Sequence, residues 1–495
     1  MTKRFFFFYE NLTKTHQGID FSRATRYTMG YFIRRKGENM KLWKPRDIDV
    51  TGGPLFSSIV RYSIPVMLAT FLQTLFNAVD IMVLGNMADK VAVASVGATS
   101  VIVSLCVMTF VGLSAGTSIL LSRYFGAGKE DYVKKTVGTS LWFAFGLGIL
   151  LSAVAIPLAT PFLRLTSCPE ECVAAARLYL VIYFCAIPAI MLYNFGSAIL
   201  NSIGDTQRPL FYLMISGVTN VVLNILLCLI LTEKVAAVAI ATFASQLIGA
   251  ICVLIRLGHI SGACRVNYRE VPFDRRLLGK ILIHGGPCAF TTAMYPLSNL
   301  MIQSAINRLG TAAMSGNVAS GSIEGFVNAF TNAFAVCTLT FLGQNLGREN
   351  KERVWKTLLY CSLLAVGLGT LLGPGIRFFY GEELLSLYIP GETDAIAAGM
   401  VRMKYLLTIY FVPALNGVVL NSLKAFGYSA LPALNSFITV ILFRIFWMAV
   451  IYPPEQTLEN LYLCYRWSWS ITLIVNLLML TVVLIRYKKG KFKRI

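Results

Sequence analysis

Gln73, Asn77 and Asp80 place two amides and a carboxylate in a stretch, Pro65 to Gly85, that is otherwise mostly apolar. Their spacing of four and then three residues puts them on one face of a helix. A carboxylate flanked by amide oxygens can bind a proton or coordinate Na⁺, and removal from water favours its protonated form. We expect Asp80 to bind a coupling cation; the alternative is a structural carboxylate, bonded to a neighbouring helix or solvated near the surface.

Neutral oxygens recur in three later segments. Asn220 and Asn224 lie four residues apart within 208–232, and Thr242 lies within 236–257. Such side chains suit a cation shell, but they also bond membrane helices to one another, and we favour that second role. Tyr193 and Asn194, within 174–200, are candidates for lining a substrate cavity.

A second acid, Glu324, lies near the middle of an expected helix. Arg444 and Arg466 fall inside two further expected helices of the same half of the chain. Because a buried acid in a membrane usually finds a base, we expect a structural ion pair for Glu324, or a role in binding substrate or a proton.

The composition around these residues is that of a membrane protein. The chain of 495 residues is 56% hydrophobic and 14% charged, against about 25% charged in soluble domains. One spanning helix needs roughly 20 apolar residues, and the apolar runs are long and continuous rather than alternating. We expect an all-α protein with twelve spans: 59–86, 93–121, 134–160, 174–200, 208–232, 236–257, 278–306, 313–341, 355–376, 396–422, 429–452 and 460–485.

The net charge of +20 is unevenly distributed. With the N-terminus inside, 34 of the 44 Lys and Arg fall in segments on the cytoplasmic side. This is the positive-inside pattern. It predicts a protein of the cell membrane whose two termini both lie on the cytoplasmic side. The basic charge then sets orientation and contacts anionic lipid, so we expect no nucleic-acid partner.

The ends and the cysteines differ from the spans. Residues 1–50 read as a disordered basic tail, with Met40 as an alternative start, and 487–495 as a second basic tail. Cys168 and Cys172 fall in an expected outer loop, where free thiols are favoured over a disulfide. We expect no cofactor, and no metal beyond Na⁺ at Asp80.

The two halves of the chain resemble each other at an offset of 221 to 223 residues. Pro65 matches Pro287, and Gly126 matches Gly347. Each copy would contain six helices, and an even number of spans returns the chain to the same side of the membrane. The two copies are therefore parallel, as in alternating-access transporters. We expect two pseudo-symmetric six-helix lobes, 51–260 and 276–486, joined by a linker, 261–275. Prolines inside four expected helices predict bends or moving hinges: Pro65, Pro188, Pro287 and Pro413.

No nucleotide-binding motif is found to energise transport. GAGK at 126–129 fails as a P-loop, which needs Gly where Arg123 stands and Ser or Thr where Glu130 stands. A transporter with this sequence would use an ion gradient, or no energy source.

Several separated motifs resemble the multidrug and toxic compound extrusion (MATE) family over roughly 50–490. Besides the pattern from Pro65 to Gly85, they are DVTGGPLF (49–56), SVGATS (95–100), GLSAGTSILLSRYFGAG (112–128), GDTQRPL (204–210), NVASGSIEGF (317–326) and FLGQNLG (341–347). The resemblance implies a two-lobed antiporter that exports amphipathic, often cationic compounds in exchange for H⁺ or Na⁺.

In one bacterial branch the coupling ion is thought to bind in the N-terminal lobe. Asp80, Asn220 and Thr242 match that branch's helix 1, 5 and 6 positions. The chain departs from the pattern at Asn224, where the branch commonly has an acid. One carboxylate fewer would weaken attraction for Na⁺, while proton exchange at Asp80 stays possible. The other branch's acids have no counterpart in 278–306 or 396–422.

We therefore expect a secondary active exporter, not an enzyme, that acts as a monomer on small organic substrates in contact with membrane lipids. Three alternatives stay open: an exporter of one specific metabolite, a lipid-linked flippase of the wider superfamily, and a receptor or scaffold that does not transport.

Overall fold

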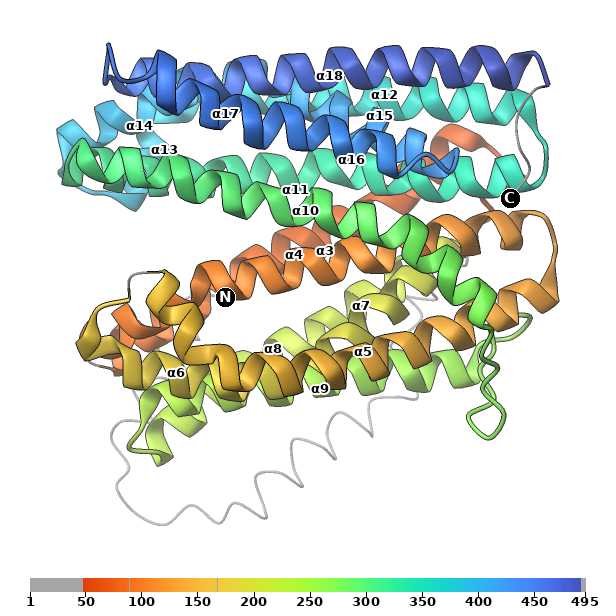
Figure 1. Ribbon diagram of the computed structural model, residues 1–495, viewed down its shortest axis with the longest axis horizontal. Helices are drawn as coiled ribbons and strands as arrows, with labels where there is room; N and C mark the ends of the chain where they lie inside the picture. The colour runs from red at the N-terminus through yellow and green to blue at the C-terminus, as the bar shows by residue number, and fades with distance from the viewer. Residues whose placement is uncertain (1–47, 89, 167, 491–495) are drawn as a thin grey trace, which may run out of the picture. The chain divides into compact units, whose positions relative to one another are not determined.

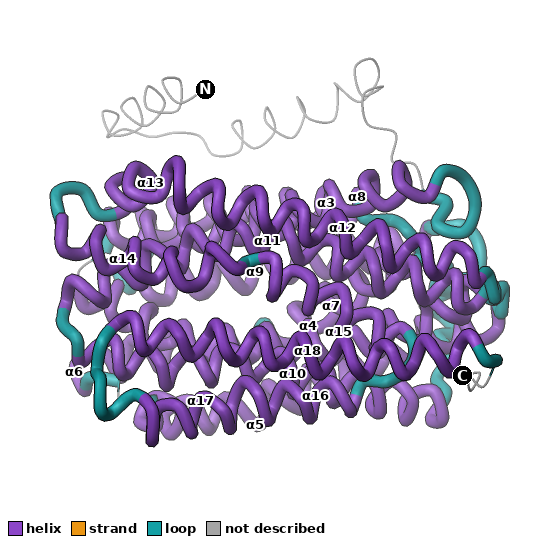
Figure 2. Tube along the Cα trace, turned by 90° about the horizontal axis from the view of Figure 1, so that it is seen from above, coloured by secondary structure: helices purple, strands orange, loops and turns teal. Residues whose placement is uncertain are grey.

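The computed structural model describes residues 48–88, 90–166 and 168–490, and within these ranges every regular element is a helix (Figure 2). The basic tail before residue 48, with Met40, lies outside the described residues, as do residues 491–495. The backbone of Asn77 and Asp80 is helical, but their side chains also lie outside the description.

The described part of the first half forms seven helices, with the expected span 174–200 divided in two. They are α3 (Leu55–Met87), α4 (Lys90–Gly126), α5 (Glu130–Leu165), α6 (Glu170–Cys185), α7 (Ile187–Ser202), α8 (Gln207–Ile230) and α9 (Lys234–His259).

Residues 260–274 connect α9 to the second half, whose helices contain shorter π and 3₁₀ segments. The elements are α10 (Arg275–Arg308), α11 (Thr311–Gly347), α12 (Lys351–Gly375), η2 (Ile376–Tyr380), α13 (Gly381–Tyr388), α14 (Thr393–Leu406), η3 (Leu407–Ile409), α15 (Phe411–Ala425), α16 (Ala430–Ser436), η4 (Phe437–Leu442), α17 (Phe443–Phe446), η5 (Trp447–Ile451) and α18 (Leu458–Lys488).

Nine helices of the described chain are long and apolar enough to span a membrane, or eleven when each of two bent pairs is one span. The bends, 48° between α6 and α7 and 47° before α15, lie next to Pro188 and Pro413. The twelfth expected span is α10, which is 34 residues long but less apolar. Its polar side chains bond to other helices: Thr292 donates to the Met108 carbonyl at 2.7 Å and Ser298 to the Val440 carbonyl at 3.2 Å. The number twelve therefore stays a prediction.

The repeat is visible in the backbone. Gly128 and Glu349, 221 residues apart, both follow a long helix and both have left-handed backbone angles, with φ of 68° and 58°. The two bends lie at Ala186 and Tyr410, close to the same offset. Figure 1 shows the orange-to-lime helices of the first half below the green-to-blue helices of the second.

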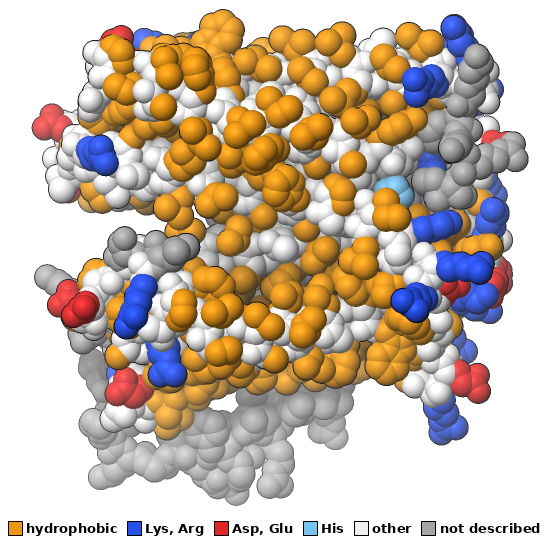
Figure 3. All heavy atoms as spheres, viewed as in Figure 1, with side chains coloured by type: hydrophobic (Ala, Val, Ile, Leu, Met, Phe, Trp, Pro, Cys, Tyr) orange, Lys and Arg blue, Asp and Glu red, His pale blue; other side chains and the backbone are white. Residues whose placement is uncertain are grey.

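The bundle has two unlike ends. The end we call the basic end holds residues 48–54, the turns after α4, α7, α11 and α15, and the connection 260–274. Lys and Arg gather there, at the right-hand edge of Figure 3. At the left-hand edge, which we call the far end, the same view shows the surface hollowed between the two halves.

The two halves meet backbone to backbone in the part of the bundle near the basic end. A Cβ added to Gly116 of α4 would lie 2.4 Å from the Ile281 carbonyl oxygen of α10, and one added to Gly126 would lie 2.1 Å from the Gln344 oxygen of α11. A Cβ at Gly347 would lie 2.2 Å from the Arg123 oxygen. Only glycine permits so close an approach, so these positions hold the halves together at this end.

Replacement of Gly116 by alanine is expected to separate α4 from α10, because the new methyl group meets backbone that cannot move aside. The cost should be about 1–3 kcal/mol, as for other overpacked sites, and the melting temperature of the purified protein should fall. Gly97→Ala is the matched control on the same helix, since its Cβ would have nothing within 4 Å. Equal melting temperatures for the two variants would contradict the packing described here.

Candidate functional site

Three of the predicted polar residues of the first half, Asn220, Asn224 and Thr242, lie together at α8 and α9. Asn220 Nδ2 donates to Thr242 Oγ1 at 3.5 Å, and Asn224 Nδ2 donates to Asn220 Oδ1 at 3.2 Å. Thr242 Oγ1 donates in turn to the Val238 carbonyl at 3.0 Å. Asn224 is fully buried and Asn220 nearly so. The bond from Asn220 to Thr242 joins α8 to α9, while the other two lie within α8 and within α9. A polar bond between helices is typical of side chains that hold membrane helices together.

Helix α3 packs on α8 beside these asparagines. The ring of Phe76 lies against Gly217, where an added Cβ would be 2.0 Å from a ring carbon. Both helices run from the basic end to the far end, so the next turn of α3, with Asp80, lies beside the next turn of α8, with Asn220. Gln73, one turn before Phe76, is exposed. The backbone thus brings the turn of Asp80 beside the amides.

Asn224 acts here as a hydrogen-bond donor. Its Nδ2 donates to Asn220 Oδ1, and an ionised carboxylate at this position would only accept. The hydrogen bond between residues 220 and 224 therefore suits an amide at 224. With an acid there, the two side chains would have to rearrange unless a cation lay between them.

Asn224→Asp is expected to make stability depend on Na⁺. An unpaired buried carboxylate costs roughly 3–5 kcal/mol, and a bound cation restores part of that loss by mass action. The melting temperature of the purified variant should fall without Na⁺ and rise as Na⁺ is added, while the wild type should respond little. Asn194→Asp, on α7, is the control for an added carboxylate elsewhere. No Na⁺ response in the Asn224 variant would show that this position is not near a cation site.

The second half contains a larger polar cluster, in which Glu324 has a partner that the sequence did not indicate. Arg402 of α14 lies 2.5 Å from Glu324 Oε2 of α11, and both side chains are mostly buried. Arg402 also donates to the backbone and side-chain oxygens of Asn317. Tyr462 of α18 donates to Asn317 Oδ1 at 3.1 Å, and Asn317 Nδ2 donates to Gln303 of α10 at 2.8 Å. Four helices are joined by this network.

Neither Arg444 nor Arg466 pairs with Glu324. Arg444 is 1% exposed and donates to Ser298 Oγ at 2.9 Å, with its guanidinium 4.1 Å from the Tyr465 ring centre. Neutral oxygens and a ring face stabilise this charge. Arg466 is exposed on α18. Glu324 therefore forms its buried ion pair with Arg402, which the sequence did not indicate.

The two residues suggested for a substrate cavity make local bonds. Tyr193 donates to the Pro209 carbonyl at 3.4 Å, and Asn194 donates to the Ile190 carbonyl of its own helix at 2.8 Å. Both side chains are partly exposed. Cys168 and Cys172 are free thiols; burial raises the pKa of Cys168, which lies in the turn between α5 and α6.

The basic end is closed by hydrogen bonds between the halves that the sequence did not reveal. Tyr62 lies 2.9 Å from Thr340 Oγ1 of the second half, and both hydroxyls donate to the Asn201 carbonyl, at 3.0 and 3.4 Å. Gln344 Nε2 donates to the Ser202 carbonyl at 2.7 Å. Most of these bonds use backbone oxygens at the end of α7, which no side-chain motif could indicate.

The DVTGG segment before α3 is held to the second half as well. Arg353 donates to the carbonyls of Val50 at 3.1 Å and Gly52 at 2.8 Å. Asp49 accepts the Gly52 N–H at 2.7 Å, and this bond, assisted by Thr51 and Arg353, lowers the pKa of Asp49. The motif thus orders the entry to α3 at the closed end.

Comparisons with known proteins agree on one family. The family model described as MatE matches residues 65–226 and 287–450, two segments that start 222 residues apart. A relative named probable multidrug resistance protein YpnP, from Bacillus subtilis, is 28% identical over 77% of this chain and 84% of its own length. A protein named FAD transporter, from Shewanella oneidensis, is 23% identical over 68% of this chain and 75% of its own.

A solved structure titled as the outward-facing conformation of a multidrug resistance MATE family transporter superposes with a TM-score of 0.82. It is 18% identical, and the match covers 92% of this chain and all of that one. At this identity the likeness is one of fold.

Proposed function

Because this chain belongs to the MATE family of multidrug efflux transporters, we propose that it is a secondary active antiporter that exports amphipathic, cationic organic compounds in exchange for H⁺ or Na⁺. The observation that best supports alternating access is the asymmetry of the bundle. The halves touch through glycine backbone at the basic end, and the surface between them is hollowed at the far end. Such a form opens to one side of a membrane.

Orientation follows from charge. With the basic end in the cytoplasm of a cell-membrane protein, both termini are inside and the hollow faces outward. This assignment makes the described form the outward-open one, from which substrate leaves and into which the coupling ion enters. We take twelve spans in two lobes as the working topology, with α10 as a span shielded on one side by α4.

Coupling in this proposal resides at Asp80. The approach of Phe76 to Gly217 supports this, because it brings the backbone turn of Asp80 near the Asn220 turn of α8. Amide oxygens there would be available to a cation or a protonated carboxyl group. Protonation of Asp80 would remove a charge and let α3 repack against α8. With Asn224 in place of a second acid, H⁺ is favoured over Na⁺ as the coupling ion.

The hollow between the lobes supports the proposed substrate class, because amphipathic cations could enter it and contact aromatic side chains. Phe71 of α3 lies 5.3 Å from Phe326 and 6.2 Å from Phe330 of α11, ring centre to ring centre. This aromatic group joins the two lobes and offers a face to an organic cation.

A second candidate is export of one specific metabolite. The relative named as a transporter of FAD favours it, since that molecule is a large, anionic compound. An exporter of an anion would use the cations of the second half, among them Arg402, rather than aromatic faces.

The test is accumulation of a fluorescent amphipathic cation, such as ethidium, in cells that lack their own efflux pumps. Expression of the wild type should lower the cellular dye, and collapse of the proton gradient should restore it. A protein of normal abundance in the membrane that leaves dye accumulation unchanged would remove drug export and leave the metabolite exporter.

A further inference from the structure

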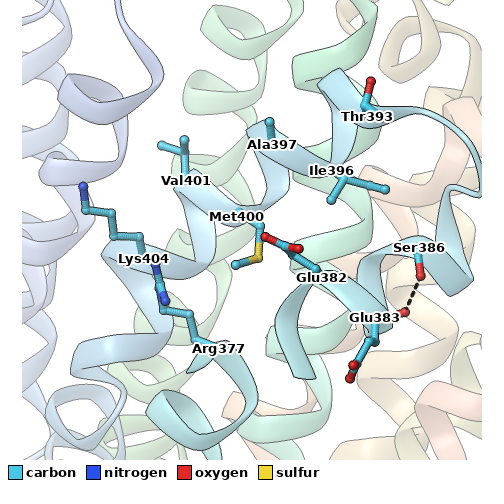
Figure 4. A pocket seen from close by; sticks show the side chains of 10 residues that line it. All are labelled: Arg377, Glu382, Glu383, Ser386, Thr393, Ile396, Ala397, Met400, Val401 and Lys404. Carbon is cyan, nitrogen blue, oxygen red and sulfur yellow. Dashed lines mark hydrogen bonds between the residues drawn. The ribbon is translucent and has the colours of Figure 1, made fainter. Parts of the chain in front are cut away.

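A separate cavity of about 700 Å³ lies at the far end of the second half, between η2, α13 and α14 (Figure 4). Its apolar side comes from Met400 and Val401 of α14. Arg377 of η2 and Glu382 of α13 both reach toward α14, while Lys404 and Glu383 lie at the rims. Neither the ion site nor the polar cluster of Glu324 includes any of these residues.

The opposite charges in this cavity do not pair with each other. Among the described residues, no carboxylate lies within 4.0 Å of Arg377 and no cation within that distance of Glu382. The Nε of Arg377 is shielded from solvent and has no hydrogen-bond partner in the described part of the chain. The guanidinium lies 4.8 Å from the ring of Phe378. A cation and an acid held apart in one cavity match a ligand that carries both charges.

The cavity lies at the depth of lipid headgroups. Helix α12 starts at the basic end and has 25 residues, so it rises about 37 Å before η2 begins. That length exceeds the roughly 30 Å of a bilayer's hydrocarbon core. The next residues, Phe378, Phe379 and Tyr380, are 66%, 76% and 61% exposed. Tyr380 is of the type that is enriched at membrane interfaces, and the two apolar phenylalanine rings beside it suit the adjoining acyl chains.

We propose that this cavity binds a phospholipid with a zwitterionic, primary-amine headgroup, of the phosphatidylethanolamine type, from the leaflet at the far end. Arg377 binds the phosphate, with Lys404 close to it at the rim. Glu382 accepts hydrogen bonds from the ammonium group, which a trimethylated choline headgroup cannot donate. The exposed aromatic residues of η2 contact the acyl chains.

Two substitutions test separately the recognition of the ammonium group and of the phosphate group of this lipid. The full-length protein is purified in detergent, and retained dioleoyl phospholipid is measured by native mass spectrometry and by melting temperature. The wild type should bind the ethanolamine lipid about tenfold more tightly than the choline lipid, since charge-assisted hydrogen bonds discriminate at that scale. Glu382→Gln should reduce the preference, because its neutral amide oxygen still accepts hydrogen bonds but without the negative charge. Arg377→Gln should weaken the binding of both lipids.

Control variants separate a loss of this site from a general change in surface charge or in folding. Arg164→Gln and Glu170→Gln alter exposed charges at the far end of the first half and should leave lipid binding unchanged. If Arg377→Gln does not fold, Arg377→Lys should fold and retain binding. The proposal fails if Glu382→Gln keeps the preference, if phosphatidylglycerol binds more tightly than the ethanolamine lipid, or if soluble glycerophosphoethanolamine or ethidium displaces the lipid fully.

Discussion

Asp80→Asn is expected to abolish gradient-driven export while the protein still folds and inserts. An amide has nearly the shape of a carboxyl group, but it cannot exchange a proton and carries no charge for a cation. Efflux of ethidium from proteoliposomes with an imposed H⁺ or Na⁺ gradient should fall to the rate of protein-free vesicles.

Asp131→Asn is the matched control for this result. Asp131 belongs to the same half, is exposed at the basic end and forms a surface ion pair with Lys135, four residues away. Surface pairs of this kind contribute little, so its export rate should equal that of the wild type. Export by the Asp80 variant that still responds to the gradient would remove Asp80 from the coupling mechanism.

Arg402→Met is expected to destabilise the second half strongly, because it leaves Glu324 in a mostly buried site without its base. Breaking one member of a buried pair costs roughly 3–5 kcal/mol, and Asn317 also loses its bonds to the guanidinium. The melting temperature of the purified variant should therefore fall by several degrees.

The double variant Glu324→Met with Arg402→Met tests whether the pair itself is the cause. With both charges replaced by apolar groups of similar size, stability should recover most of the loss. Glu324→Gln alone should be milder than Arg402→Met, since Arg402 keeps its contacts with Asn317. Additive losses in the double variant would show that Glu324 and Arg402 do not interact, contrary to the geometry.

Hydropathy and proline positions predicted much of the architecture. The bends next to Pro188 and Pro413 appear where these prolines remove backbone donors. The helix that departs most from expectation, α10, carries polar side chains such as Thr292 and Ser298 that bond to α4 and η4. Composition alone cannot distinguish polar side chains that contact other helices from polar side chains that face water.

In the candidate sites, too, some contacts could be predicted from the sequence and others could not. The i, i+4 spacing of Asn220 and Asn224 predicted their proximity, because helical geometry determines it. The partner of Glu324 could not be predicted, since Arg402 is 78 residues away in sequence and reaches Glu324 only because α14 packs on α11. The hydrogen bonds of Tyr62 and Gln344 use carbonyl oxygens, which carry no residue signature.

The central claim is exchange: substrate leaves as an ion enters. Proteoliposomes containing the wild type would be loaded with ethidium, and dye efflux and internal pH would be followed in the same sample after an inward proton gradient is imposed. With exchange, the gradient should accelerate efflux and loaded substrate should increase proton entry; a sodium gradient is tested in parallel. Efflux that ignores both gradients, or ion entry that ignores substrate, in monodisperse and correctly inserted protein would contradict exchange.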